Sequence, residues 1–369
     1  MSEHHSFHHI YPWTKAPLIV SAPMRDVSGP ALAAAVSAAG GLGFIAGGED
    51  VSGLENKLSE AARLVAEHKA RRGSPDDNSL LFHNSSSLPV GIGVINWGAD
   101  FNVALPLIVK YRPCAVWLFA PSESASDQIP WVQQIREQTD GDVAIWVQVG
   151  NIEEACAAVA ELQPDVLVLQ GSDGGGHGLV RSASVLSLVP EMIDRLQTKF
   201  FDGSSNTVIP KIVAAGGLAD GRGAAAAFTL GAEAIAMGTR FLASFEADIP
   251  KEYQQAIIEA KYGGANTVRS HVFDSARGTS QWPSKFEPRG VINRTYTEFI
   301  AGNTTEPDNY QRYHEALRNR EQYGPNGRID TLCGTSVGLV GEVLPAGEIV
   351  RKIARDTERI LLTDRWSKL

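Results

Sequence analysis

The chain has 369 residues, of which 43% are hydrophobic and 20% are charged, and its formal net charge is −9 at pH 7. This composition is typical of a globular enzyme, and the absence of a basic stripe argues against a protein that binds nucleic acid. No apolar stretch approaches the ~20 residues that span a bilayer, and the polar start lacks a signal-peptide core, so we expect a soluble protein that is not secreted.

Apolar runs that end in glycine or other small residues recur along the first ~240 residues, which is the usual length of a (β/α)8 barrel. Eight runs predict strands: 18–24, 41–48, 88–97, 115–121, 142–150, the run ending at Gln170, the run 210–217 and the run 234–241. Alanine-rich segments between them, such as 29–39 and 152–162, have the apolar spacing of helices. Buried strands that alternate with helices indicate parallel pairing.

Two architectures fit this alternation, a TIM barrel and a doubly wound open sheet. A dinucleotide-binding open sheet carries Gly-x-Gly-x-x-Gly at its first strand-to-helix turn. Here Ala22-Pro23-Met24 stands at that turn. We therefore expect an α/β fold with a (β/α)8 TIM barrel at residues 1–245.

The pattern changes after Phe241, where proline, glycine, arginine and aromatic residues mix without strand periodicity. Helical stretches near 252–262 and 308–322 predict a smaller, mainly helical subdomain at residues 246–330, placed to cap the barrel. Residues 331–369 are expected to form one or two helices that pack back on the barrel. The polar segments 71–79 and 85–87 are typical of a surface insertion.

A run of three glycines before a histidine, Gly174-Gly-Gly-His177, follows the sixth predicted strand. Glycines let the main chain approach a flat or charged ligand closely, and an imidazole titrates near neutrality, which suits proton abstraction or stabilisation of an anion. Gln170, at the end of the same strand, offers an amide to a heteroaromatic ring. The alternative is a flexible loop that carries an incidental histidine.

Glycines also end the seventh and eighth predicted strands, at Gly216-Gly217 and Gly238-Thr239. Loops at these two positions commonly hold a phosphate in TIM barrels. Their main-chain N–H groups, with the start of the helix near Asp220, predict a phosphate cradle. Sugar-phosphate enzymes share this feature, so it indicates a bound phosphate group but does not identify the reaction.

Neither the cysteines nor the N-terminal histidines predict a metal site. The three cysteines are widely spaced without a Cys-x-x-Cys pair, and the four histidines lie on a terminus without supporting groups. We expect reduced thiols and no bound metal. The residues concerned are Cys114, Cys156, Cys333, His4, His5, His8 and His9.

Several motifs, in this order along the chain, resemble those of the nitronate monooxygenases, formerly called 2-nitropropane dioxygenases. They are Ala22-Pro-Met24, Ala38-Ala-Gly-Gly-Leu-Gly-Phe44, Gln170-Gly-Ser-Asp-Gly-Gly-Gly-His177, Ala214-Ala-Gly-Gly-Leu218, Met237-Gly-Thr-Arg-Phe241 and Gly334-Thr-Ser-Val-Gly-Leu339. The resemblance implies an FMN-containing barrel that oxidises alkyl nitronates with molecular oxygen to a carbonyl compound and nitrite. It implies no nicotinamide.

The same resemblance assigns site residues by position. His177 matches the active-site histidine, which accepts a proton from neutral nitroalkanes or holds the anionic nitronate. The segment beneath the flavin and the ring and ribityl contacts correspond to Ala22, Pro23, Met24, Asn96, Gln170, Gly175 and Gly176. The phosphate side corresponds to Gly216, Gly217, Ala236, Met237, Gly238 and Thr239. Ile95 and Trp97, beside Asn96, depart from the usual pattern.

Two further positions depart from the family pattern. Arg25-Asp26 stands where many relatives carry small neutral residues, which puts charge just past the first strand. Asp173 occupies a position often filled by glutamate.

Other readings stay open at this stage. An FMN-dependent enoyl reductase shares the glycine and histidine loop but needs a nicotinamide donor. A non-flavin phosphate-ligand-binding barrel would share the phosphate cradle alone. A dehydrogenase like that of inosine monophosphate would need a cysteine in the loop before His177, and the loop has none.

The chain ends in Ser367-Lys368-Leu369, the tripeptide that serves as a peroxisomal address. We therefore expect a peroxisomal protein, and otherwise a cytoplasmic one. The expected partners are a small-molecule nitronate and O2, and a homodimer is one assembly that the sequence leaves open.

Overall fold

Eight parallel strands close into a barrel in the computed structural model, which describes residues 6–70, 87–200 and 209–363. Neighbouring strands follow chain order, and β9 closes the barrel against β1. The strands are β1 Ile19–Ser21, β2 Leu42–Gly48, β3 Gly91–Ile95, β4 Ala115–Phe119, β5 Ala144–Val149, β6 Val166–Gln170, β8 Lys211–Ala215 and β9 Ala234–Met237. The predicted (β/α)8 barrel is therefore confirmed. The predicted surface insertion at 71–79 lies outside the described residues.

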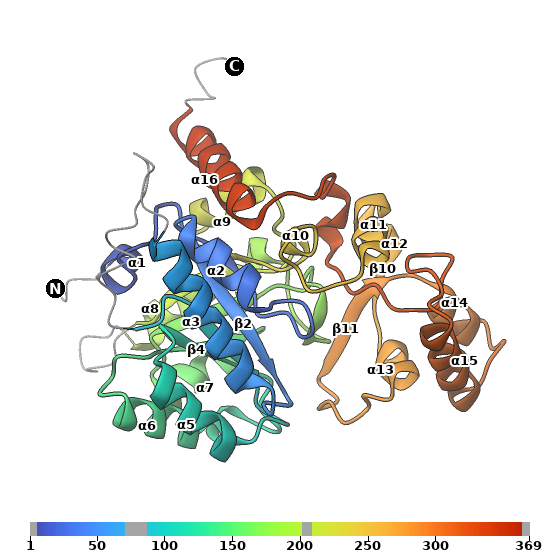
Figure 1. Ribbon diagram of the computed structural model, residues 1–369, viewed down its shortest axis with the longest axis horizontal. Coiled ribbons are helices and arrows are strands. Elements are labelled where there is room, and N and C mark those ends of the chain that lie inside the picture. The colour runs from blue at the N-terminus through green and yellow to red at the C-terminus, as the bar shows by residue number, and fades with distance from the viewer. Residues whose placement is uncertain (1–5, 71–86, 201–208, 364–369) are drawn as a thin grey trace.

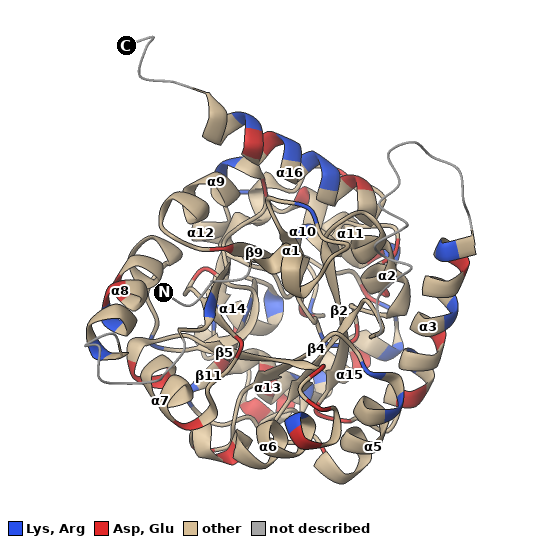
Figure 2. Cartoon of the chain, turned by 90° about the vertical axis from the view of Figure 1, so that its left-hand side faces the viewer, with Lys and Arg blue, Asp and Glu red and all other residues tan. Residues whose placement is uncertain are grey.

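Helices surround the barrel as an outer layer, and many positions along them are Lys, Arg, Asp or Glu (Figure 2). Strands buried on both faces are what the continuous apolar runs require, and every residue of β2, β8 and β9 is buried. The helices of this layer are α2 Pro30–Ala38, α3 Leu54–Ala70, α5 Phe101–Tyr111, α6 Ile129–Gln138, α7 Ile152–Leu162, α8 Val185–Phe200 and α9 Gly221–Thr229.

The last described helix, α16 Ala346–Leu362, returns to the barrel and packs against α9 and α2 (Figure 1). Its buried residues include Ile349, Val350 and Ile353, which join the barrel's hydrophobic core. No helix within the described ranges is both long enough and apolar enough to cross a membrane.

Large aromatic side chains fill the barrel interior, as expected of a packed core rather than a pore. The rings of Trp117 and Trp146 stack with centroids 5.7 Å apart, and Phe44 lies 4.9 Å from Trp146. A Cβ at Gly91 would come within 2.3 Å of the Phe44 ring, so only glycine leaves room there. Tyr11, which follows the short helix α1 Phe7–Ile10, accepts a 2.8 Å hydrogen bond from the Trp146 indole.

A second, smaller sheet lies beside the barrel and contains the strand that carries His177. It has three antiparallel strands, β10 Thr267–Arg269, β11 Phe286–Val291 and β7 Gly176–Leu179, in that order. In the register of β7 and β11, His177 pairs with Pro288. The glycine and histidine segment is therefore partly a paired strand, whereas the sequence pattern indicated only a loop.

The C-terminal subdomain packs on the opposite side of this sheet from the barrel strands, with β11 running between the two (Figure 1). Helices dominate it, as the sequence predicts, but β10 and β11 were not expected there. Its helices are α11 Lys251–Glu259, α12 Gly263–Asn266, α13 Val272–Arg277, α14 Arg294–Ile300 and α15 Glu306–Arg318. Three short helical segments complete the fold: η1 Ala125–Gln128, α10 Thr239–Leu242 and η2 Thr335–Leu339.

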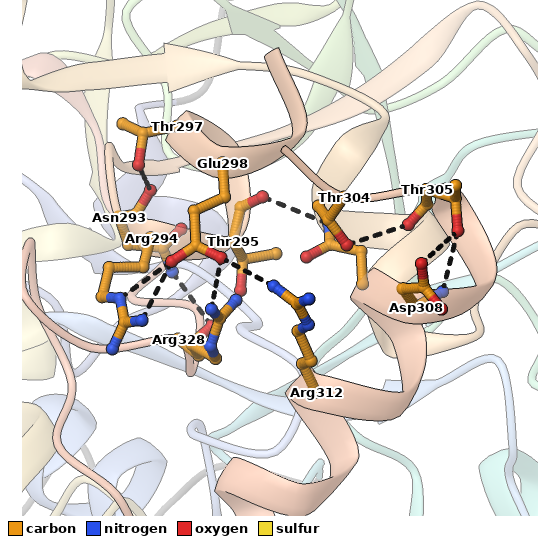
Figure 3. A network of polar contacts seen from close by, with 11 residues as sticks. Asn293, Arg294, Thr295, Thr297, Glu298, Thr304, Thr305, Asp308, Arg312 and Arg328 are labelled. Atoms are coloured by element: carbon orange, nitrogen blue, oxygen red, sulfur yellow. Dashed lines mark hydrogen bonds and ion pairs between the residues drawn. The ribbon is translucent and has the colours of Figure 1, made fainter. Parts of the chain in front are cut away.

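One carboxylate ties the outer helices of the subdomain together. Glu298 on α14 forms ion pairs with Arg294 of the same helix at 3.0 Å, with Arg312 of α15 at 3.1 Å, and with the buried Arg328 (Figure 3). Asn293 caps α14 by accepting from the main-chain N–H of Tyr296. These contacts fix α14, α15 and the segment that leads back to the barrel as one body.

The hydrogen bond between Tyr11 and Trp146 gives a test of how the barrel interior is held. Replacing Tyr11 with Phe leaves the buried Trp146 N–H without its acceptor, so we expect the free energy of unfolding to fall by about 1–3 kcal/mol. Urea unfolding measures this change. Tyr262→Phe is the matched control, because that side chain is 82% exposed and should leave stability unchanged. Equal stability of both variants would contradict the assignment.

Candidate active site

A cavity of about 380 Å³ opens at the carboxyl ends of the barrel strands and extends into the C-terminal subdomain. Ligands of TIM barrels bind at this end. Most of the sequence-predicted site residues line it: Ala22, Pro23, Met24, Gln170, Gly175, Gly176, His177, Gly216, Gly217, Ala236, Gly238 and Thr239. Asn96 and Met237 are not among the lining residues in the described part of the chain. Asn96 instead accepts a 2.7 Å hydrogen bond from Gln128.

The segment after β1 is held rigidly along one side of the cavity. The Ser28 hydroxyl donates to the Ala22 carbonyl at 2.8 Å and accepts from the Met24 N–H at 3.0 Å. Pro23 packs directly over Gly93, where a Cβ would come within 2.3 Å of the proline ring. The main chain of this segment therefore presents a fixed surface to a ligand.

Glycines after β8 and β9 bring the main chain of several loops together at one end of the cavity. Gly216 and Gly217 adopt φ values of +94° and +77°, which strongly favour glycine. A Cβ at Gly216 would also come within 2.8 Å of the Gly171 carbonyl oxygen. The main chain at the end of β8 can therefore adopt this course only with glycine at these positions.

Two amides at the start of α9 are already used within the helix, although the sequence-based expectation places this helix start in the phosphate cradle. The Asp220 side chain caps the helix by accepting from the N–H groups of Arg222 and Gly223. A different group faces the cavity instead. The Ser336 hydroxyl, on η2, lines the cavity, is buried, and has no hydrogen-bond partner within the described residues. It is a donor that a bound anionic or polar group would satisfy.

His177 sits at the wall between barrel and subdomain, and its side chain is only 11% exposed. Its Nε2 lies 2.9 and 3.0 Å from the two carboxylate oxygens of Asp274 on α13. The Trp282 ring stacks on the imidazole, with centroids 3.6 Å apart and planes 7° apart. Asp274 and Trp282 of the C-terminal subdomain therefore hold His177 in place.

Burial lowers the pKa of His177 below its ordinary value. Asp274 opposes this change, while Arg277 and Arg269 reinforce it through their positive charges. The net direction means that the imidazole is neutral at neutral pH and free to accept a proton.

Arg269 on β10 holds the glycine and histidine segment through its main-chain carbonyls. Its guanidinium donates to Gly174 at 2.7 Å and to Gly176 at 3.0 Å, and also to Glu287. Burial lowers the pKa of Arg269 to about 10, and the charge of Arg289 acts in the same direction. The positive charge of Arg269 is therefore compensated by neutral main-chain carbonyls, and within the described residues the guanidinium forms no ion pair with a carboxylate.

The subdomain side of the cavity carries an ion pair between a half-buried arginine and a buried aspartate. Arg277 donates to Asp330 at 3.1 Å, and the Tyr313 hydroxyl donates to the other oxygen of that carboxylate. Asp330 raises the pKa of Arg277 above its ordinary value. All three line the cavity, so this wall is polar, whereas Trp117 and Phe119 give the barrel side an apolar surface.

The two charged residues that depart from the family pattern also line the cavity. Arg25 pairs with Glu49 at 2.6 Å, and the side chain of Asp26 is 75% exposed. Asp26 has a φ of +58°, a conformation in which aspartate is better tolerated than most residues. Asp173 accepts a 3.0 Å hydrogen bond from Thr335, which braces the loop before His177 against η2.

Sequence reasoning missed five residues of the site. They are Asp274, Arg277, Trp282, Tyr313 and Ser336. The first four carry no recognisable signal, because they lie in a region where charged and aromatic residues mix without period, so only the tertiary fold reveals which of them face His177. Ser336 lies in the family motif at 334–339, and that motif is the one signal that points to it.

Comparison with known proteins gives consistent matches over nearly the whole chain. A family model described as nitronate monooxygenase matches residues 9–69 and 98–354. The chain is 45% identical to the nitronate monooxygenase npaC of Metarhizium robertsii, covering 95% of this chain and 94% of that protein. It is 37% identical to the nitronate monooxygenase of Neurospora crassa, covering 95% and 92% of the two chains.

Solved structures share the architecture at lower identity. The nitroalkane oxidase of Streptomyces ansochromogenes superposes with a TM-score of 0.70 at 22% identity, covering 97% of this chain and all of that one. FabK of Thermotoga maritima superposes with a TM-score of 0.65 at 24% identity, covering 96% of each chain. At these identities the likeness shows a common fold.

If the Arg269 contacts with main-chain carbonyls hold the segment around His177 in place, weakening them should loosen that segment. Arg269→Lys removes the planar, forked donor set, so we expect the free energy of unfolding to fall by about 2–3 kcal/mol. Amide hydrogen exchange should also quicken across residues 174–178. Arg222→Lys serves as control, because that side chain is 70% exposed. Unchanged exchange in Arg269→Lys would show that the guanidinium does not order this segment.

Proposed function

The chain belongs to the nitronate monooxygenase family, a family of oxidoreductases, and from this premise we propose that it binds FMN and oxidises alkyl nitronates with O2 to a carbonyl compound and nitrite. The observation that supports the proposal most strongly is the pairing of a glycine-lined cavity with a neutral, buried imidazole at the carboxyl end of the barrel. The cofactor, when bound, would take electrons from the nitronate and pass them to oxygen.

The residues present fit an FMN molecule. The rigid main chain of Ala22–Met24 would lie beneath the ring, and Gln170 and Gly175 would contact the ring and ribityl side. The phosphate would rest on the main chain of Gly217 and Gly238. The unpartnered hydroxyl of Ser336 supplies a further donor for a polar group of the cofactor.

His177 would act on the substrate's proton. With a neutral nitroalkane, the imidazole would accept the proton from the carbon that bears the nitro group. With a preformed nitronate that step is already complete, and the residue would instead help to hold the anion. Its lowered pKa favours the free base at neutral pH, which is the form that accepts a proton, whereas holding an anion requires the protonated ring.

The polar subdomain wall bears on which nitronates fit. Arg277 presents a donor, and the Tyr313 hydroxyl oxygen and Asp330 present acceptors, on the subdomain side of the cavity. A nitronate with a second polar group, such as propionate 3-nitronate, would find partners there. Simple alkyl nitronates would rely on the apolar side.

A second candidate is an FMN-dependent enoyl reductase that uses NADH or NADPH, because FabK shares the fold over 96% of this chain. The identity of 24% makes this a likeness of architecture. The two candidates differ in the electron donor, which an experiment can identify.

The donor test compares reductants without oxygen. We expect propyl-2-nitronate to bleach the flavin absorbance of the purified protein within one turnover, whereas NADH and NADPH leave it nearly unchanged. Stopped-flow spectroscopy measures both. Fast bleaching by a nicotinamide, with none by the nitronate, would favour the reductase. A colourless protein that takes up no FMN would favour a barrel that binds another phosphate ligand.

Replacing His177 with Asn tests the proton-acceptor role. The variant should bind FMN as the parent does, yet kcat/KM for neutral nitroalkanes should fall by about 10²–10⁴-fold, because a positioned base typically contributes that much. Preformed nitronates should lose far less. Steady-state oxygen uptake with both substrate forms measures the difference, and equal, slight losses for both would argue against the role.

We also propose that Ser367-Lys368-Leu369, which lie outside the described residues, direct the protein to peroxisomes. Deleting the tripeptide should move a fluorescently tagged protein to the cytosol without changing its activity. Adding one residue after Leu369 should have the same effect, because the address is read at the extreme carboxyl end. An unchanged organelle pattern in both variants would contradict the proposal.

A further inference from the structure

His177 is held by one of its two ring nitrogens. Both oxygens of Asp274 lie within 3.0 Å of Nε2, and an ionised carboxylate can only accept a hydrogen bond. The shared hydrogen therefore sits on Nε2. Nδ1 has no hydrogen-bond partner within the described part of the chain, and the residue lines the cavity.

The carboxylate and the ring are each fixed by further contacts. Asp274 is 5% exposed, and its Oδ1 also accepts from the Thr279 hydroxyl at 2.7 Å. Trp282 covers one face of the imidazole at 3.6 Å and is itself 8% exposed. The ring can therefore turn only by breaking the contact with Asp274 and leaving the stack.

We propose that Asp274 is a positioning residue that fixes His177 in its Nε2–H form, so that Nδ1 is the atom that takes the substrate's proton. This inference rests on the proposed function of the site. It gives the C-terminal subdomain a part in the proton transfer, because Asp274 lies in that subdomain, 97 positions after the histidine in the chain.

The charges around the ring give Asp274 a second effect. Proton transfer to Nδ1 creates an imidazolium, which burial and the positive charges of Arg277 and Arg269 disfavour. Asp274 is the acidic group that offsets them, and it raises the pKa of His177 against these influences. Removing its charge should therefore make the histidine a weaker base, because the protonated form loses its partner.

The hydrogen position can be tested on the holoenzyme without any substrate. Protein labelled with ¹⁵N-histidine should show a pyrrole-type nitrogen shift at Nε2 of His177 and a pyridine-type shift at Nδ1. Comparison with His177→Asn identifies the signal. The opposite pattern, with hydrogen on Nδ1, would overturn the proposal even if the protein oxidises nitronates. A protein inactive on nitronates would refute the proposed function and leave this result intact.

The charge effect is tested with Asp274→Asn, whose amide oxygen can still accept from Nε2 while Thr279 accepts from the amide nitrogen. We expect kcat for neutral nitroalkanes to fall about 10–100-fold with KM nearly unchanged. The acid limb of the pH profile should move to lower pH, because loss of the carboxylate lowers the pKa of His177. Preformed nitronates should be much less affected.

Two further variants separate positioning from general damage. Asp274→Ala removes the acceptor, so the ¹⁵N pattern should shift toward a mixture of the two hydrogen positions. Glu315→Gln makes the same change of carboxylate to amide at an exposed position of α15 and should leave the rates and the acid limb unchanged. An acid limb that stays in place in Asp274→Asn, or moves to higher pH, would overturn the proposal.

Discussion

The pairing of β7 with β11 is the constraint on which the site depends. The register sets His177 opposite Pro288 and so anchors a segment rich in glycine, which would otherwise have little to hold it. Arg269 reinforces the pairing by binding the carbonyls of Gly174 and Gly176. The histidine therefore occupies one position between the barrel and the subdomain, where Asp274 and Trp282 can reach it. A side chain held in this way loses little freedom when a ligand binds.

The charged side chains around His177 follow one rule. Each of them meets a compensating group: Arg277 meets Asp330, Arg269 meets main-chain carbonyls, and Asp274 meets the imidazole and the Thr279 hydroxyl. Burying a charged group without such partners would cost roughly several kcal/mol. In the proposed reaction, His177 is the group of this wall that exchanges a proton.

The barrel could be predicted from the sequence because its signals are local. Continuous apolar runs that end in glycine, such as the one ending at Gly216-Gly217, need only neighbouring residues to be recognised, and the glycine and histidine motif marks the site in the same way. Asp274 had no such signal, since its role is set by a partner 97 positions away. The strand β11 was missed because Pro288 and Gly290 interrupt its pattern, and β10 because it has only three residues. The free start of α9 was expected from the position of Asp220, but that side chain caps the helix itself.

The proposed function depends on a flavin that the glycine-lined cavity holds against His177. A crystal structure of the protein with FMN bound would locate the cofactor. We expect the FMN phosphate on the loops of Gly217 and Gly238, and the isoalloxazine ring between the Ala22–Met24 segment and the imidazole. A flavin bound elsewhere, or a cavity that stays empty in crystals soaked with FMN, would contradict it.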